Sequence, residues 1–299
     1  MFLSRKFPIN PDKDLEVIQL VEGINARHGT TFKLVRRYLE GENQGAYRVI
    51  DTGNTSLVLK WNSRPGWLAR IQLARKITDR LRRLSPLVPE YVLVGAFPEG
   101  ANYWLQTLFP GNPASSLTVE QARALIGLNE LQAGQALSQK QNWSIYIKSV
   151  VFDDISGWKQ TLHNYSTESA ELLTRLGHFV CGLEDVCNKT GDIVHGDLTP
   201  GNILLEENRV SGVVDWDAAG CGDRAFDLGL LLFYCYENYP VRHLLTTYLL
   251  EITGPERLKV YLVYTVLTQI DWSIRHHFPQ DVERLLVLAN LIIGDFEHL

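Results

Sequence analysis

The stretch from residue 193 to residue 217 constrains the fold of this chain more than any other. It reads Ile-Val-His-Gly-Asp-Leu-Thr-Pro-Gly-Asn-Ile-Leu-Leu, then four polar residues, then Val-Ser-Gly-Val-Val-Asp-Trp-Asp. Between Asn202 and Asp215 lie two apolar runs, 203–205 and 210–214, that are typical of short strands joined by a turn. The pattern therefore predicts a polar loop containing Asp197, then a β-hairpin, then a second polar turn.

The side chains of Asp197, Asn202 and Asp215 suit phosphoryl transfer. One carboxylate can orient a nucleophilic hydroxyl, while an amide oxygen and a second carboxylate hold Mg2+ on the phosphates. Mg2+ prefers hard oxygen ligands and commonly takes one or two carboxylates beside phosphate oxygens. The other interpretation is a hairpin with incidental acidic residues, which requires three polar residues to fall at these spacings by chance.

Length and composition indicate an ordered intracellular protein. The 299 residues suffice for one large domain or two lobes, and shares of 45% hydrophobic and 21% charged residues are ordinary for globular chains. The four cysteines show no CxxC spacing, which favours free thiols in a reducing compartment over a zinc site. We see no secretory signal and no apolar run of bilayer length, so we expect a cytoplasmic protein without a membrane segment.

Charge is unevenly distributed along the chain. Residues 1–109 carry 16 basic and 10 acidic side chains, a net of +6, whereas residues 110–299 carry 13 and 24, a net of −11. A basic first part suits an anionic ligand such as a nucleotide, and an acidic second part can attract a cationic substrate. Solvated surfaces without a partner would show the same imbalance.

The first part of the chain predicts a small antiparallel sheet flanked by helices. Helical patterns span residues 8–29 and 66–84, and strands are expected at 32–38, 46–51, 55–61, 92–96 and 103–108. Gly41 and Gly45 in the first turn can let the backbone approach phosphates, although any β-turn favours glycine. Lys60, near the end of the third strand, is placed to reach such phosphates. The arginines on the second helix lack interleaved aromatic residues, so we expect no nucleic-acid binding.

A lobe boundary is predicted at residues 109–113, which contain two prolines and a glycine. We therefore expect a nucleotide-binding lobe at 1–109, and a helical lobe with the catalytic loop and the acceptor site at 110–299. In this second lobe the helical patterns cover residues 118–138, 168–188, 225–237, 241–252, 255–276 and 279–293. Residues 140–157 are rich in aromatic and β-branched side chains and have no clear pattern.

Two motifs, taken together, carry a resemblance to a known family. They are His195-Gly196-Asp197-Leu198-Thr199-Pro200-Gly201-Asn202 and Val214-Asp215-Trp216-Asp217, and the segment 222–228 fits the same pattern. In these motifs the chain resembles the aminoglycoside phosphotransferase and choline kinase-like family, from about residue 32 to the C-terminus. The resemblance implies an α+β class: a bilobal protein-kinase-like fold with an antiparallel-sheet N-terminal lobe and a mainly helical C-terminal lobe.

The resemblance also implies a role for individual residues. Asp197 is the expected catalytic base, Asn202 and Asp215 are the expected Mg2+ ligands, and His195 and Asp227 are expected to support the loop. Asp217 is either a second metal contact or a surface group. The implied cofactors are ATP (or GTP) and Mg2+. The implied nucleotide contacts are Lys60, Gly41, Gly45, Thr107 and Phe109.

One departure from kinases concerns the partner of Lys60. Kinases pair this lysine with a glutamate on the next helix, but no glutamate occurs between Trp61 and Pro89. By spacing, Gln72 is expected to replace it, with Asp79 as a weaker candidate. An amide can accept a hydrogen bond from the ammonium but brings no charge, so it orients the lysine less strongly. The missing glutamate leaves open a non-catalytic, nucleotide-binding pseudokinase.

The sequence is least informative about the acceptor. Only eleven residues separate Asp215 from Asp227, which leaves little room for a protein kinase's activation loop, so a small alcohol is expected. Asp271, Trp272 and Glu237 are candidate contacts, because carboxylates hold amines and aromatic rings hold cations, although such residues also pack in cores. We expect an ATP-dependent O-phosphotransferase, monomeric or homodimeric, for a cationic acceptor such as an aminoglycoside antibiotic. Choline, ethanolamine or a sugar is the alternative.

Overall fold

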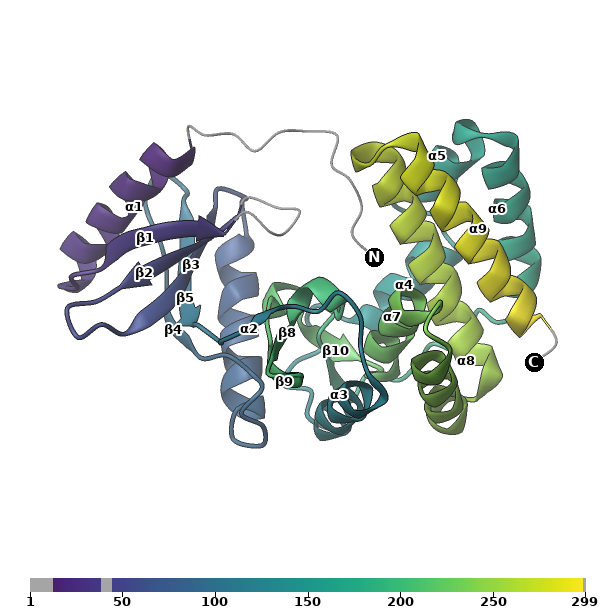
Figure 1. Cartoon of the computed structure of the whole chain (residues 1–299). Helices are drawn as coiled ribbons and strands as arrows, with labels where there is room; N and C mark the ends of the chain where they lie inside the picture. Colours follow the sequence, from purple (N-terminus) through teal and green to yellow (C-terminus); the bar gives the residue numbers. More distant parts are fainter. Residues whose placement is uncertain (1–12, 39–44, 298–299) are drawn as a thin grey trace.

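A five-stranded antiparallel sheet forms the first lobe (Figure 1). The computed structural model of this chain describes residues 13–38 and 45–297. Across the sheet the strands follow the order β1 (Lys33–Tyr38), β2 (Ala46–Ile50), β3 (Ser56–Asn62), β5 (Asn102–Thr107) and β4 (Tyr91–Ala96). Lys60 lies opposite Trp104 in the register of β3 and β5, which places its side chain near the centre of the sheet.

Helices cover both faces of this sheet. On one face, α1 (Lys13–His28) packs Val17, Val21 and Ile24 against alternate strand residues such as Tyr47 and Leu59. On the other face, α2 (Trp67–Leu81) buries side chains at helical spacing: Ile71, Ala74, Ile77 and Leu81. The spacing of three to four residues gives α2 one continuous apolar side, as the sequence pattern predicted.

The second lobe is built mainly of helices around two small sheets (Figure 1). The helices are α3 (Val119–Leu131), α4 (Trp143–Val151), α5 (Trp158–Tyr165), α6 (Thr167–Phe179), α7 (Ala225–Cys235), α8 (Tyr239–His276) and α9 (Pro279–Phe296). One small sheet joins β6 (Asn112–Pro113), β8 (Ile203–Glu206) and β9 (Arg209–Val213), and the other pairs β7 (Asp192–Val194) with β10 (Gly220–Gly222). Within the described residues, no helix is both long enough and apolar enough to cross a bilayer.

Several expected boundaries differ from the structure for local reasons. The unassigned region 140–157 contains α4, whose N-cap Asn142 accepts a hydrogen bond from the Ile145 backbone. The helix expected over 168–188 is α6, which ends at Phe179. The shorter helix α5 precedes it, and the capping residue Ser166 separates the two. The proposed lobe boundary stays a prediction, since one apolar cluster runs from α2 into the helices of the second lobe.

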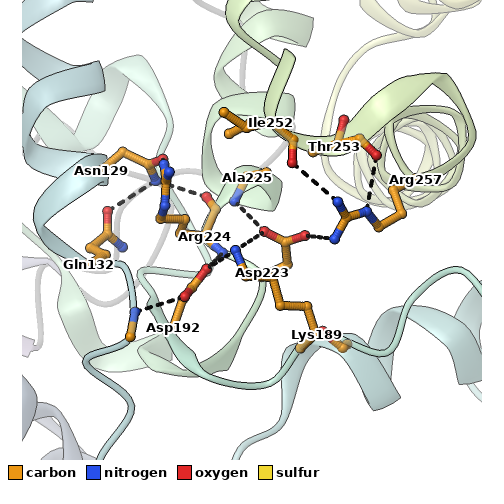
Figure 2. Close-up of polar contacts among 12 residues, drawn as sticks. Asn129, Gln132, Lys189, Asp192, Asp223, Arg224, Ala225, Ile252, Thr253 and Arg257 are labelled. Carbon is orange, nitrogen blue, oxygen red and sulfur yellow. Dashed lines mark hydrogen bonds and ion pairs between the residues drawn. The ribbon is translucent and has the colours of Figure 1, made fainter. Parts of the chain in front are cut away.

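A break in α8 organises a buried polar network (Figure 2). Gly254 takes φ 71° and ψ 172°, a conformation that is essentially restricted to glycine, and Pro255 follows it. The Arg257 guanidinium donates to the carbonyls of Ile252 and Thr253 on the N-terminal side of the break. It also donates to the carboxylate of Asp223 at 3.0 Å.

Asp223 links this break to the start of α7. Its side chain is 3% exposed and accepts hydrogen bonds from the Tyr261 hydroxyl and from the Ala225 backbone N–H. Lys189 lies 3.6 Å away and also pairs with Asp192 at 2.7 Å, so the buried charge is compensated on several sides. The network therefore fixes where α7 begins relative to α8.

We expect Arg257→Met to lower the free energy of unfolding by about 3 kcal/mol, because it leaves the buried Asp223 carboxylate without its main counter-charge. Arg284→Met is the matched control. Arg284 and Glu237 form an ion pair in which both side chains are more than half exposed, so its loss should cost less than about 1 kcal/mol. Urea denaturation of both variants measures the difference, and equal midpoints would contradict a buried role for Arg257.

Candidate active site

The loop after β7 is held from behind by one buried carboxylate. Asp227, near the start of α7 and 0% exposed, accepts hydrogen bonds from the backbone N–H groups of His195 at 2.8 Å and Gly196 at 2.9 Å. The amide of Gln132 donates to it at 2.9 Å. Burial raises the pKa of Asp227 to about 6 against the opposing effect of these three donors, so the carboxylate is charged at neutral pH. Gln132 had no signal in the sequence.

His195 joins this loop to the turn that bears Asp215. Its Nε2 lies 2.9 Å from the Val214 carbonyl, and its Nδ1 lies 3.1 Å from the backbone nitrogen of Asp197. A neutral ring with the proton on Nε2 satisfies both contacts, because Nε2–H then donates and Nδ1 accepts. Burial lowers the pKa of His195 to about 4. The ring is thus a neutral brace, 1% exposed, rather than a proton carrier.

Asn202 binds back onto Asp197 across the loop. The Asn202 Nδ2 donates to the Asp197 carbonyl at 2.8 Å and to its carboxylate at 2.9 Å. Because the amide nitrogen is directed at Asp197, the Oδ1 atom of Asn202 points elsewhere, and among the described residues nothing donates to it. This oxygen can accept a cation.

Asp215 adopts left-handed backbone angles, φ 65° and ψ 50°. Non-glycine residues rarely adopt this conformation, and such strain is concentrated at functional positions. Its carboxylate lies 2.8 Å from the ammonium of Lys60. Burial lowers the pKa of Lys60, but the charges of Asp215 and Asp217 outweigh it and raise the net pKa. Burial raises the pKa of Asp215, but Lys60 outweighs it and the net pKa is lowered.

The expected partner of Lys60 was wrong. Gln72 is exposed on α2, and within the described residues Lys60 pairs instead with Asp215 from the other lobe. The weaker candidate, Asp79, lies 4.0 Å from Arg75 on its own helix. A carboxylate from the turn at 215–217 therefore takes the place of the missing glutamate as the partner of Lys60.

Asp217 is held by side chains of the first lobe and is not a solvated surface group. Its carboxylate accepts a hydrogen bond from the Tyr91 hydroxyl at 2.9 Å, and its backbone carbonyl accepts one from Arg70 Nε at 2.7 Å. Burial and the neighbouring charge of Asp215 raise its pKa to about 7. The sequence gave no signal for either Arg70 or Tyr91 at this site.

The expected nucleotide contacts lie around the junction between the lobes. Thr107, at the end of β5, accepts a hydrogen bond from the Glu90 N–H and donates its own N–H to the Glu90 carbonyl. The Phe109 ring packs on Gly212 of β9, where an added Cβ would meet it at 2.4 Å. Gly45 has φ 92°, which favours glycine, and Gly41 lies outside the described residues. Their roles in nucleotide binding stay predictions.

The acceptor contacts expected from the sequence each have a partner within the helices, and their roles in acceptor binding stay predictions. Glu237 lies beyond the end of α7 opposite to Asp227, roughly 15 Å along the helix, and forms an exposed ion pair with Arg284. Asp271 is 5% exposed and is paired with Arg275 on its own helix at 2.7 Å. Trp272 stacks on His276 with ring centroids 3.8 Å apart.

The oxygen atoms around Asp215 fit a magnesium ion. Asn202 and Asp215 offer hard oxygen ligands from two adjacent segments, and Mg2+ completes its octahedron with phosphate oxygens and water. The described residues contain no cluster of three or more His, Cys, Asp or Glu side chains that could bind a metal by themselves. A site of this kind therefore depends on a phosphate ligand for the remaining contacts.

The low pKa of His195 predicts how stability changes with pH. Between about pH 4 and 6.5 the unfolded chain binds a proton that the buried ring does not, so His195 makes the folded state less stable as the pH falls. The shift corresponds to about 3 kcal/mol at most. In His195→Gln the deficit in unfolding free energy relative to wild type should be largest at pH 7 and should shrink towards pH 4.

Urea denaturation across this pH range measures the effect. His243→Gln, which changes an exposed histidine on α8, is the matched control and should leave the pH profile unaltered. A constant difference between wild type and His195→Gln from pH 7 to pH 4 would contradict a neutral, buried ring.

Curated proteins with similar sequences include two antibiotic kinases. The hygromycin-B 4-O-kinase of Escherichia coli is 23% identical over 262 residues, which cover 79% of this chain and 73% of that protein. The viomycin phosphotransferase of Streptomyces vinaceus is 35% identical over 83 residues, which cover 25% of this chain and 29% of that protein.

Solved structures of two phosphotransferases share the fold of this chain. A thermostable mutant of aminoglycoside phosphotransferase APH(4)-Ia, in ternary complex with AMP-PNP and hygromycin B, gives a TM-score of 0.68 at 19% identity, covering 91% of this chain and 97% of that chain. The macrolide 2'-phosphotransferase of Brachybacterium faecium gives 0.57 at 16% identity, covering 92% and 98%. These neighbours confirm the predicted fold class.

A family comparison covers the catalytic loop and the contacts of Lys60. Residues 35–261 match the phosphotransferase enzyme family. The matched region is more than half of the chain and includes Lys60, the loop from His195 to Asn202, and Asp215. The predicted enzyme class is thereby confirmed, and the chain belongs to the phosphotransferase enzyme family.

Proposed function

We propose that this protein transfers the γ-phosphoryl group of ATP, or of GTP, to a hydroxyl of a small cationic acceptor such as an aminoglycoside or a similar antibiotic. The observation that carries the proposal is the arrangement around Asp215. Lys60 from the sheet lobe contacts the Asp215 carboxylate directly. The loop that bears Asp197 and Asn202 is joined to the same turn through His195.

In this proposal each polar group has one task. Lys60 binds nucleotide phosphates, and its pairing with Asp215 orients the ammonium before the nucleotide arrives. Asn202 and Asp215 would hold Mg2+, which neutralises charge on the phosphates when bound. Asp197 accepts the proton of the acceptor hydroxyl, and the hydrogen bond from Asn202 fixes the direction of its carboxylate.

The proposal also assigns a separate role to each lobe. We propose that residues 1–109 bind the nucleotide and that residues 110–299 bind the acceptor. The net charges of +6 and −11 support this division, because phosphates favour the first part and a cationic acceptor favours the second. The two antibiotic kinases among the relatives, named for hygromycin B and viomycin, support an antibiotic acceptor.

Removing the proposed base should abolish turnover while leaving nucleotide binding intact. Asp197→Asn keeps the size of the side chain but not its charge, so ADP release with Mg-ATP and the best acceptor should fall roughly 100- to 10,000-fold. A panel of hygromycin B, viomycin, a macrolide, choline, ethanolamine and sugars identifies that acceptor. The thermal shift caused by Mg-ATP should persist in the variant.

Asp185→Asn, which changes a fully exposed carboxylate on the second lobe, is the matched control and should retain wild-type turnover. Near-normal turnover in Asp197→Asn would remove Asp197 from the mechanism. If the wild-type protein binds Mg-ATP but phosphorylates no compound of the panel, the result favours the pseudokinase alternative.

A further inference from the structure

Four aromatic rings gather beside the catalytic loop. We call Trp143, Tyr146, Trp158 and Tyr264 the aromatic wall. The ring centroids of Tyr146, Trp158 and Tyr264 lie 6.1 to 6.4 Å from one another, and Trp143 lies 5.6 Å from Tyr146 and 6.3 Å from Tyr264. The rings meet edge to face and come from three helices, α4, α5 and α8.

The wall touches the segments that carry the proposed catalytic residues. Trp143 packs so closely on Gly196 that an added Cβ there would lie 2.3 Å from its ring. The Trp143 indole N–H donates to the Ala218 carbonyl at 2.9 Å, just after the turn of Asp215 and Asp217. One ring is therefore fixed between the loop of Asp197 and the metal turn.

The polar atoms of the other three rings are not used by the described protein. Tyr264 is only 6% exposed, yet its hydroxyl makes no hydrogen bond within the described residues. The same holds for the Tyr146 hydroxyl and the Trp158 indole N–H. Burial raises the pKa of Tyr264, and the nearby Tyr146 and Asp197 raise it further, which places this ring within electrostatic reach of the proposed base. Because the Tyr264 hydroxyl is not one of the fully buried side-chain atoms without a partner, it is accessible, and a ligand hydroxyl can reach it.

Ordinary core packing explains only part of this cluster. Trp143 also stacks on Phe226 at 5.2 Å and belongs partly to the core. Tyr146, in contrast, is 38% exposed, and Trp158 is partly exposed. One face of Trp143 is covered by Phe226, so Tyr146 and Trp158 offer a ligand more free surface than Trp143 does.

We propose that the aromatic wall binds a saccharide or cyclitol ring of the acceptor and so presents one of its hydroxyls to Asp197. The C–H face of such a ring carries partial positive charge and matches the negative face of an aromatic ring. Its other hydroxyls can satisfy the unused donors of Tyr146, Trp158 and Tyr264. The inference rests on the proposed function, because it assigns a class of acceptor to the same site.

Substitutions in the wall should affect the acceptor and not the nucleotide. In Tyr146→Ala and Trp158→Ala the KM for hygromycin B, a probe with cyclitol and sugar rings, should rise roughly tenfold, because each variant loses a ring face against which a sugar packs. The KM for ATP should stay within a factor of two. Tyr146→Phe keeps the ring and should restore most of the affinity.

Tyr239→Ala is the matched control, because Tyr239 is 64% exposed at the start of α8 and belongs to another ring pair. It should leave both KM values unchanged. A wall that serves packing alone would lower thermal stability in Tyr146→Ala while the KM for the acceptor stays at the wild-type value, and this outcome would overturn the proposal. Phosphorylation of choline but of no ring-bearing acceptor would also overturn it, while leaving the proposed function intact.

Calorimetric titration separates failure of this inference from failure of the proposed function. If the wild-type protein phosphorylates nothing in the panel, the proposed function fails. Titration with hygromycin B then decides the inference by itself. Binding that is weakened in Tyr146→Ala and Trp158→Ala supports the wall as a sugar-binding surface, whereas no binding, or equal binding in the variants, contradicts it.

Discussion

The buried carboxylate of Asp227 is the constraint on which the rest of the site depends. It accepts the backbone N–H groups of two consecutive loop residues, so it fixes the direction of the peptide that leads into Asp197. Gly196 makes this possible, because its φ of 84° and its contact with Trp143 exclude a side chain. A buried charge is tolerable here since three N–H donors surround it.

The contact between Lys60 and Asp215 shows how this chain manages without the glutamate that usually positions the lysine. The ammonium finds its counter-charge in the other lobe, and the raised pKa of Lys60 and lowered pKa of Asp215 are consistent with a stabilised pair. One consequence is that nucleotide and Mg2+ would compete for groups that are already paired. Helix α2 contacts this turn instead through the hydrogen bond that Arg70 donates to the Asp217 carbonyl.

Sequence reasoning predicted the elements whose signals are local. The sheet of the first lobe, the hairpin of β8 and β9, and the loop from His195 to Asn202 follow from alternating strands and short motifs. It failed for Gln72, because spacing along a chain does not say which face a helix turns towards a site. Gln132, Tyr91 and Arg70 carried no signal, since each acts through a single contact with a residue far away in sequence.

Contacts between residues far apart in sequence also explain why the proposed acceptor site could not be predicted. The aromatic wall combines residues 143–158 with Tyr264, more than a hundred positions later, and the link between them is packing against α7 and the loop glycine. The region 140–157 resisted assignment because its aromatic side chains interrupt the regular period, and one of them, Trp143, packs on Gly196 next to Asp197. A segment whose pattern fits no element well can therefore indicate where a fold has been adapted to a ligand, since binding and packing place different demands on the same residues.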